Sequence, residues 1–156
     1  MKVRIKKLDN NAVIPSYAVH GDAGMDLTAT RKWFDESGNI CYGTGLAFEI
    51  PEDYVGLVFP RSSCSKKQLV LANAVAVIDS GYRGEVVMKF KPSLALDRNI
   101  CVSMNRIYDI YEVGERIAQM IIMPYPTIEF VEVDELSQTE RGCKGYGSTN
   151  NSGDNR

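Results

Sequence analysis

Hydrophobic and polar residues alternate in short stretches along most of the chain. Val3 and Ile5 alternate with lysine and arginine, and residues 55–59 show the same alternation. A hydrophobic residue at every second position is typical of a β-strand with one face turned to a core. A looser form of the pattern, in which Ile128, Phe130 and Val133 are separated by polar positions, predicts another strand near residue 130.

Three further stretches are almost continuously hydrophobic: Val70–Ile78, Val86–Phe90 and Ile117–Met123. Runs of this length predict strands that are buried on both faces. Glycine and proline separate the runs, as expected for short strands joined by turns. The stretch Lys91–Val113 carries no clear turn signal, and it predicts a strand, a loop and a second strand.

The chain offers one short helix candidate, Ser62–Leu69, in which Ser62 or Ser63 could cap the N-terminus. Many short strands with so little helix predict an all-β fold, either a barrel or a sandwich. We expect residues 1–140 to form a single β domain. Residues 141–156 are rich in glycine, serine and asparagine, so we expect them to form a flexible tail.

Composition narrows the classes of protein to which the chain can belong. Its 156 residues are enough for one domain, and 44% of them are hydrophobic, which is enough for a core. The 18 basic and 20 acidic residues give a net charge of −2, which argues against a nucleic-acid partner. The N-terminus lacks the apolar stretch of a signal peptide, and no run is long enough to span a membrane. We therefore expect a cytoplasmic protein that contacts neither nucleic acid nor membrane.

Cysteine and histidine usage argues against several kinds of catalytic or metal site. The four cysteines, Cys41, Cys64, Cys101 and Cys143, lie far apart, and the chain has a single histidine, His20. A structural zinc site needs clustered cysteine or histidine ligands, and a serine or cysteine nucleophile needs a histidine base. Free, largely inert thiols are the expectation for these cysteines.

Five segments carry residues suited to chemistry, and together they resemble the trimeric dUTP pyrophosphatases. They are AGMDL (23–27), PRSS (60–63), NAVAVIDSGYRGE (73–85), GERIAQ (114–119) and RGCKGYGST (141–149). All five occur in the order, and near the spacing, found in that family, and the resemblance covers the chain from end to end. It implies a dUTPase-like β-barrel or jelly roll with one short helix, assembled as a homotrimer.

The resemblance also implies an activity. A dUTP diphosphatase hydrolyses dUTP to dUMP and pyrophosphate with Mg²⁺, which keeps uracil out of DNA and supplies dUMP for dTMP synthesis. The expected partners are therefore dUTP and two further copies of the chain, with active sites shared between subunits.

Phosphate contacts are expected at PRSS and GERIAQ. Arg61 presents a fork of donors suited to phosphate oxygens, and the hydroxyls of Ser62 and Ser63 lie at a predicted helix start. A capped surface turn is the alternative interpretation. The resemblance assigns the α- and β-phosphates to Arg61 and Ser62, and it makes Gln119 a phosphate ligand. It places Asp26 near the metal, in contact through water; the alternative is a structural hydrogen bond to a turn.

The nucleoside is expected at the third segment, which the resemblance makes a β-hairpin. Asp79 would orient and deprotonate the attacking water, or it could simply stabilise a turn. Tyr82 would lie against the deoxyribose and exclude a 2′-hydroxyl, or it could be an ordinary packed strand residue. The side-chain amide of Asn73 can both donate and accept, which suits the uracil edge. Main-chain groups of three residues would complete this contact: Val77, Ile78 and Val87.

The last segment resembles a lid that crosses onto a neighbouring subunit. Arg141 would reach the γ-phosphate, and Tyr146 would stack on uracil. Gly147 would let the backbone approach the phosphates, and Ser148 and Thr149 would add hydroxyl groups. The alternative is a frayed terminus.

Two other functions need to be weighed. The related dCTP deaminases carry a glutamate in the strand after the hairpin, where this chain has Lys89. A lysine cannot take the role of that glutamate, so the sequence argues against deamination. A regulatory protein of the same fold is the second alternative, with residues 91–113 as the candidate contact for a protein partner. Since the matched catalytic residues are all present, regulation would be a second role.

Overall fold

The computed structural model describes residues 1–92 and 109–144. The chain divides into two compact units, Met1–Pro126 and Thr127–Arg156. The strands lie in the first unit and are β1 (Arg4–Lys7), β2 (Met25–Thr28), β3 (Arg31–Phe34), β4 (Ile40–Gly43), β5 (Leu46–Glu49), β6 (Tyr54–Pro60), β7 (Leu69–Leu71), β8 (Ala76–Ile78), β9 (Val87–Pro92) and β10 (Arg116–Pro124). A 3₁₀ helix, η1 (Ser62–Lys66), follows β6.

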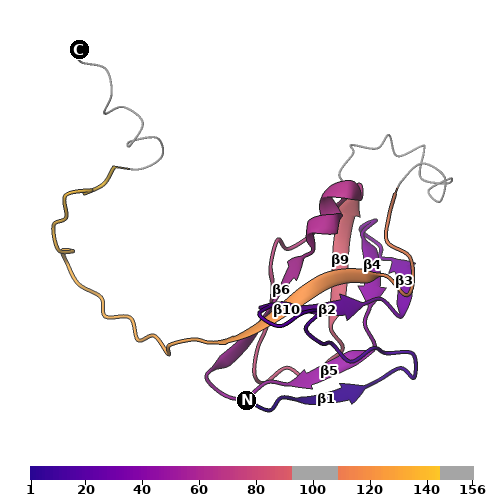
Figure 1. The fold of residues 1–156 in the computed structure, drawn as a ribbon. Coiled ribbons are helices and arrows are strands. Elements are labelled where there is room, and N and C mark those ends of the chain that lie inside the picture. The colour runs from indigo at the N-terminus through magenta and orange to yellow at the C-terminus, as the bar shows by residue number, and fades with distance from the viewer. Residues whose placement is uncertain (93–108, 145–156) are drawn as a thin grey trace. The chain divides into compact units, whose positions relative to one another are not determined.

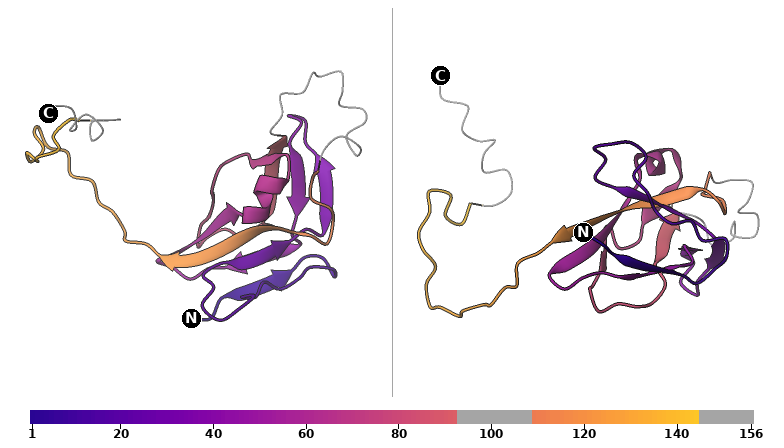
Figure 2. Two further views of the ribbon diagram at one scale, coloured as in Figure 1. Left: turned by 45° about the horizontal axis from the view of Figure 1, so that its top comes forward. Right: turned by 60° about the horizontal axis from the view of Figure 1, so that its bottom comes forward.

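The strands form three antiparallel sheets (Figures 1 and 2). One has the order β2-β10-β6-β8, the second has the order β3-β4-β9-β7, and β1 pairs with β5. Strand β10, drawn in orange, crosses the first sheet between β2 and β6 (Figure 1). The all-β fold of short strands predicted from the sequence is confirmed.

Three aromatic side chains form the centre of the core. Tyr42, Phe90 and Tyr111 are almost fully buried, and Tyr42 meets the other two edge to face at centroid distances of 5.7 and 6.2 Å. The Tyr42 hydroxyl donates to the Tyr111 carbonyl at 2.9 Å, so its polar end is satisfied inside the core. Burial raises the pKa of Tyr42 well above its ordinary value of 10.

The prediction of one continuous strand at Val70–Ile78 is wrong. The run divides into β7 and β8, which lie in different four-stranded sheets, and Val70 and Val77 are exposed. Between them Ala74 adopts a left-handed conformation with φ of 58°, and the Val75 N–H donates to the Asn73 carbonyl at 2.6 Å. Alanine seldom adopts this conformation, so the sequence gives no local sign of the turn.

The short helix predicted after β6 is present, but its extent and its cap were wrong. The 3₁₀ helix ends at Lys66, and Leu69 already belongs to β7. Arg61 occupies the N-cap position and makes no side-chain capping bond. The helix spans five residues, and within it the Ser65 hydroxyl donates to the Ser62 carbonyl at 2.7 Å.

The strand predicted near residue 130 is also wrong. Residues 127–144 contain no strand, and Phe130 and Val131 are 93% and 77% exposed. An alternating sequence becomes a strand only when a neighbouring strand supplies hydrogen bonds. For Lys91–Val113, most of the predicted strand–loop–strand lies outside the described residues. Across the part of the chain that the structure describes, no helix is long and apolar enough to cross a membrane.

Asp35 organises the turn between β3 and β4. Its carboxylate accepts the backbone N–H groups of Ser37 and Asn39 at 3.0 and 2.9 Å, and the Lys89 ammonium at 3.0 Å. The hydrogen bonds from Asn39, followed by Lys89, hold the pKa of Asp35 well below its ordinary value of 3.8. Lys89, the residue that argued against deamination, is thus engaged in an ion pair on sheet β3-β4-β9-β7.

Replacing Asp35 with alanine is expected to lower the midpoint of thermal unfolding at neutral pH. Because the folded-state pKa is depressed, this contribution to stability is present above the ordinary pKa and is lost as the pH falls. The difference between wild type and variant should therefore shrink below about pH 4 in melts followed by circular dichroism. The exposed neighbour Glu36 provides a matched control, Glu36→Ala. A difference that stayed constant with pH would contradict this assignment.

Candidate active site

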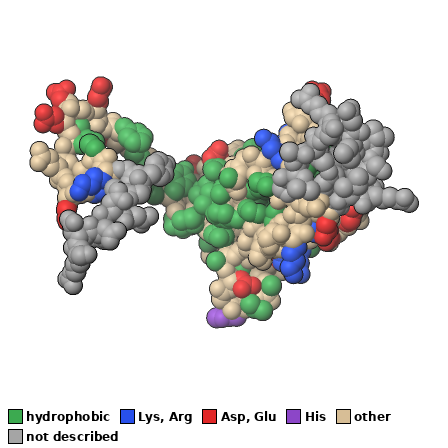
Figure 3. All heavy atoms as spheres, turned by 90° about the horizontal axis from the view of Figure 1, so that it is seen from above, with side chains coloured by type: hydrophobic (Ala, Val, Ile, Leu, Met, Phe, Trp, Pro, Cys, Tyr) green, Lys and Arg blue, Asp and Glu red, His purple; other side chains and the backbone are tan. Residues whose placement is uncertain are grey.

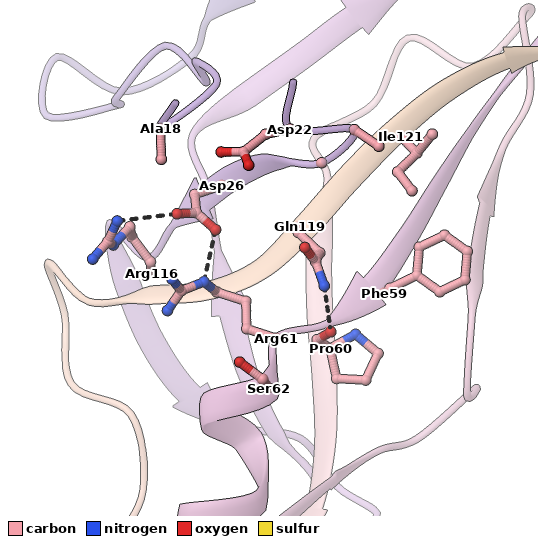
Figure 4. Close-up of a pocket in the computed structure, with 12 residues that line it drawn as sticks. Ala18, Asp22, Asp26, Phe59, Pro60, Arg61, Ser62, Arg116, Gln119 and Ile121 are labelled. Atoms are coloured by element: carbon pink, nitrogen blue, oxygen red, sulfur yellow. Dashed lines mark hydrogen bonds and ion pairs between the residues drawn. The ribbon is translucent and has the colours of Figure 1, made fainter. Parts of the chain in front are cut away.

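A cavity of about 630 Å³ lies where the starts of β2 and β10 meet the end of β6 (Figure 4). We call it the arginine cavity, because two arginines line it together with Asp26, Ser62 and Gln119. The register of the sheet explains the gathering: Gln119 on β10 lies opposite Asp26 on β2 and opposite Phe59 on β6.

Asp26 is held between the two arginines. The Arg61 Nε donates to its Oδ1 at 2.6 Å, and the Arg116 Nη1 donates to its Oδ2 at 3.1 Å (Figure 4). The side chains of Asp26 and Arg61 are largely buried, at 20% and 25% exposure, so this pair is well ordered and only partly screened by water. Asp26 therefore orients the Arg61 guanidinium, and N–H groups that bond neither Asp26 nor Ser63 are left for an anion in the cavity.

Gln119 is fixed by two close neighbours. Its Nε2 donates to the Pro60 carbonyl at 3.1 Å, and a Cβ added at Gly24 would lie 2.8 Å from its Oε1. A side chain at position 24 would therefore push the Gln119 amide out of place. Gly24 belongs to the AGMDL segment, which thus supplies both a carboxylate and the space for the amide.

The two serines of the PRSS segment have different environments. Ser62 is exposed and lines the arginine cavity. Ser63 does not line it: its hydroxyl lies 3.3 Å from both the Arg61 Nη1 and the Tyr111 hydroxyl. The Ser63 side chain therefore connects the arginine to the aromatic core, and a direct ligand contact finds no support in this geometry.

The residues of the arginine cavity do not form a direct cation-binding cage. No group of three or more acidic, cysteine or histidine side chains comes together within residues 1–92 and 109–144. Both oxygens of Asp26 already accept from guanidinium groups. Since each oxygen already accepts from an arginine, a contact to a divalent cation through bound water suits this carboxylate, an arrangement that is common for Mg²⁺.

A second cavity, of about 290 Å³, lies along the connection between β8 and β9, and we call it the Asp79 cavity. Its lining includes all six residues predicted to contact the nucleoside or the attacking water: Asn73, Val77, Ile78, Asp79, Tyr82 and Val87. The predicted β-hairpin is wrong, because β8 pairs with β6 and β9 pairs with β4 and β7. The connection passes from one sheet to the other, and the cavity lies along it.

Asp79 is exposed, and its carboxylate accepts no hydrogen bond from the residues that the structure describes. Its backbone carbonyl, not its side chain, accepts the Tyr82 N–H at 3.1 Å. Other aspartates of the chain do stabilise turns with their carboxylates, as Asp9 does with Asn11 at 2.8 Å. The geometry favours a carboxylate available to solvent over the alternative of a turn-stabilising residue.

Tyr82 is not a packed strand residue. It lies in the loop after β8, is 45% exposed, and donates its hydroxyl to the Glu85 carbonyl at 3.0 Å. Asn73 lies in the turn between β7 and β8, where only its backbone carbonyl takes part in the turn. Both side chains are therefore able to contact a ligand in the Asp79 cavity.

Asp79 and Arg61 lie toward opposite ends of β6. Antiparallel pairing places Ile78 opposite Gly56 and Ala76 opposite Val58, so Asp79 follows the end of β8 that is remote from Arg61. Arg61 comes five positions after Gly56, which corresponds to about 17 Å along the strand. The lining residues found for the two cavities do not overlap. One chain therefore does not bring Asp79 to Arg61.

Two residues that line the cavities were not among the predicted ligands. Arg116 lines the arginine cavity beside Arg61 and forms an ion pair with Asp26. Glu85, which lines the Asp79 cavity, was not singled out. In the lid, Arg141 is exposed and donates from Nε to the Lys144 carbonyl at 3.4 Å. The remaining predicted lid residues lie outside the described part of the chain: Tyr146, Gly147, Ser148 and Thr149.

Comparisons with known proteins agree on one family. A family model described as dUTPase matches residues 10–150. The chain is 38% identical over 151 residues to the deoxyuridine 5′-triphosphate nucleotidohydrolase of Thermobifida fusca, covering 96% of this chain and 79% of the relative. It is 39% identical over 153 residues to the enzyme of the same name from Nautilia profundicola, covering 96% and 99%.

Two solved structures extend the comparison. The dUTPase of Staphylococcus bacteriophage 80alpha with dUPNHPP is 31% identical, with a TM-score of 0.77 over 94% of this chain and 97% of that one. A variant of the dUTPase from phage phi11 of S. aureus, described with a structural Mg(II) ion, is 25% identical, with a TM-score of 0.68 over 86% and 98%. The jelly-roll-like β fold expected from the sequence is confirmed by these structures.

Proposed function

The chain belongs to the dUTPase family and hydrolyses dUTP to dUMP, and from this premise we propose that a water activated by Asp79 attacks the α-phosphorus and pyrophosphate leaves. The observation that carries the proposal is the Asp79 cavity. It combines a carboxylate available to solvent with the predicted uracil and sugar contacts, in a chain with a single histidine. A general base must lie within hydrogen-bond reach of its water, and a solvent-accessible carboxylate can meet that requirement.

The nucleoside binds in the Asp79 cavity. The Asn73 amide matches the uracil edge, and the main chain at Val77, Ile78 and Val87 completes the match. A thymine methyl would collide with this backbone, because an overfilled site has no room to relax. The Tyr82 ring lies against the deoxyribose, where a 2′-hydroxyl would strike it.

The arginine cavity binds the phosphates. Arg61 supplies charge and paired donors, Ser62 a hydroxyl and Gln119 an amide, while Asp26 fixes the direction of the Arg61 guanidinium. Arg116 adds a second positive charge at the same place. These groups stabilise negative charge as the bond to the leaving pyrophosphate lengthens, which is the main catalytic term in phosphoryl transfer.

Mg²⁺ fits this site in an outer role. Asp26, whose oxygens already accept hydrogen bonds from Arg61 and Arg116, would hold the ion through bound water. When bound, the ion neutralises phosphate charge and lowers the cost of building up more. The protein itself positions the reactants: Asp79 positions the water, and Arg61 positions the phosphates.

The active site is shared between copies in a homotrimer. Within one chain, about 17 Å of strand separates Gly56, which lies opposite Ile78, from Arg61, and Asp79 lies one residue beyond Ile78. Both Asp79 and Arg61 must nevertheless act on one triphosphate. A second copy that brings its arginine cavity to the Asp79 cavity of the first would close this gap. Surfaces suited to such contacts exist, including an apolar hollow of about 250 Å³ lined by Ile14, Tyr17 and neighbouring hydrophobic residues.

Hydrophobic side chains also gather on one face of the first unit (Figure 3). In the second unit, Ile128, Phe130 and Leu136 are largely exposed. An exposed hydrophobic patch such as the one on the first unit is typical of an interaction surface. It supports self-association of the chain.

The C-terminal segment acts as the lid. Arg141 binds the γ-phosphate and Tyr146 stacks on uracil, with Gly147, Ser148 and Thr149 against the phosphates. Closure would exclude water and align the reacting groups. A cytoplasmic location, the absence of nucleic-acid and membrane partners, and a second, regulatory role through residues 91–113 stay predictions.

The assay that tests this function measures pyrophosphate release from dUTP, dTTP, dCTP and UTP in the presence of Mg²⁺. We expect release from dUTP at a kcat/KM at least about a hundredfold above that for the other three, because each carries a group that the site is built to exclude. Ammonia release from dCTP is measured in parallel. Ammonia without pyrophosphate would assign the chain to deamination and refute the proposal.

A further inference from the structure

The Tyr82 ring lies directly over Gly84. A Cβ added at Gly84 would be 2.4 Å from the Tyr82 hydroxyl oxygen, 2.6 Å from Cζ and 2.9 Å from Cε2. All three distances are far below a normal contact between heavy atoms. The ring therefore occupies the space that a side chain at position 84 would take.

The backbone does not explain why position 84 is glycine. Among residues 1–92 and 109–144, the glycines with positive φ are Gly21, Gly38, Gly45, Gly114 and Gly142. Gly84 is not among them, so an alanine there would face no conformational penalty. The Tyr82 ring is the neighbour that excludes a side chain.

The far end of the ring is anchored to a rigid part of the fold. The Tyr82 hydroxyl donates to the Glu85 carbonyl at 3.0 Å. The Glu85 carboxylate in turn accepts the Gly45 N–H at 2.8 Å and forms an ion pair with Arg31. The next residue, Val86, donates its N–H to β5 through the Leu46 carbonyl at 2.9 Å. The acceptor of the tyrosine hydroxyl is thus fixed by the turn between β4 and β5.

A half-exposed tyrosine can occupy several staggered rotamers, and two contacts select one of them here. Gly84 provides a flat surface beneath the ring, and the Glu85 carbonyl holds the hydroxyl. We propose that Gly84 is a positioning residue for sugar selection: it keeps the Tyr82 ring where a 2′-hydroxyl would strike it, and so sets the preference for dUTP over UTP. This inference rests on the proposed binding of the nucleoside in the Asp79 cavity.

Gly84→Ala is expected to displace the ring rather than to unfold the protein, because the clashing atoms belong to the end of a movable side chain. The ratio of kcat/KM for UTP to that for dUTP should rise about tenfold, which is the scale on which one excluded group changes selection. Loss of folded enzyme lowers both rates by the same factor and leaves this ratio unchanged. The ratio therefore separates a positioning role from a merely structural one.

The matched control is Gly81→Ala, three residues earlier in the same loop. No atom lies within 4 Å of a Cβ built at Gly81, and its φ is not positive, so the ratio should stay at the wild-type value. Tyr82→Ala should raise the ratio at least as far as Gly84→Ala. The double variant should match Tyr82→Ala alone, because two changes acting through one ring are not additive.

The outcomes separate this inference from the function on which it rests. A wild-type protein without dUTP hydrolysis would refute the proposed function. Normal wild-type activity with a raised ratio in Tyr82→Ala, but an unchanged ratio in Gly84→Ala, would overturn the role of Gly84 alone. An unchanged ratio in Tyr82→Ala would overturn it as well, because the ring would then not select the sugar.

Discussion

Replacing Asp79 with asparagine is expected to lower kcat for dUTP hydrolysis by roughly 10²- to 10⁴-fold, the usual contribution of a positioned base. The amide has nearly the shape of the carboxylate and can still orient a water, but it cannot take the proton. Because the Asp79 carboxylate makes no hydrogen bond within the described residues, the substitution should leave the fold and the thermal midpoint unchanged.

Steady-state kinetics and binding need to be measured together for this variant. The dissociation constant for the dUTP analogue dUPNHPP, measured by calorimetry, should stay within about threefold of the wild-type value. The reason is that the base acts on the water and not on the nucleotide. Glu36→Gln is the matched control, since it makes the same change at an exposed carboxylate remote from both cavities. Near-normal turnover by Asp79→Asn would show that another group activates the water.

Two inactive variants are expected to restore activity when their chains are mixed. Asp79→Asn leaves the arginine cavity intact, and Arg61→Ala leaves the Asp79 cavity intact. If each site combines the Asp79 cavity of one copy with the arginine cavity of another, some sites in a mixed assembly receive both intact halves. With random assembly of equal amounts, half of the chains carry Asp79 and the other half carry Arg61. A given site therefore receives both intact cavities in about one quarter of cases.

The mixing experiment requires unfolding and refolding the two variants together, or producing them in one cell, before pyrophosphate release is assayed. A mixture of Asp79→Asn with the double variant Asp79→Asn/Arg61→Ala is the control, because no chain in it carries Asp79. Activity no higher than that of the separate variants would mean that one chain holds a complete site. Solution mass of the wild type adds an independent check, since a monomer would contradict sharing.

Local patterns along the sequence predicted part of the first unit. Alternation and hydrophobic runs predicted β1, β6, β9 and β10, whereas no pattern singled out β2, β3, β4 or β5. The break inside Val70–Ile78 could not be predicted, because Ala74 adopts a conformation that its residue type disfavours. The pattern around Phe130 failed for the opposite reason: the alternation is present, but the described chain offers it no partner strand.

The candidate site also has one part that could be predicted from the sequence and one part that could not. The residues of the Asp79 cavity are close in sequence, so their gathering could be predicted from one segment and its resemblance to a family. The contacts of Arg61 and Arg116 with Asp26 depend instead on how β10 pairs with β2 and with β6. Arg116 and Asp26 alone are 90 positions apart in the sequence. No local pattern reports such a register. The structure therefore adds a role for Asp26, which orients two arginines, and its water-mediated metal contact stays a prediction.

Because Asp79 and Arg61 lie toward opposite ends of β6, the rate of turnover is expected to depend on the concentration of the enzyme. If no chain carries a whole site, diluting the protein below the dissociation constant of its assembly abolishes turnover while every chain stays folded. Specific activity would then rise with protein concentration before it levels off. A defective copy would also inactivate sites that it shares with intact copies. The fraction of activity lost would then exceed the fraction of defective chains.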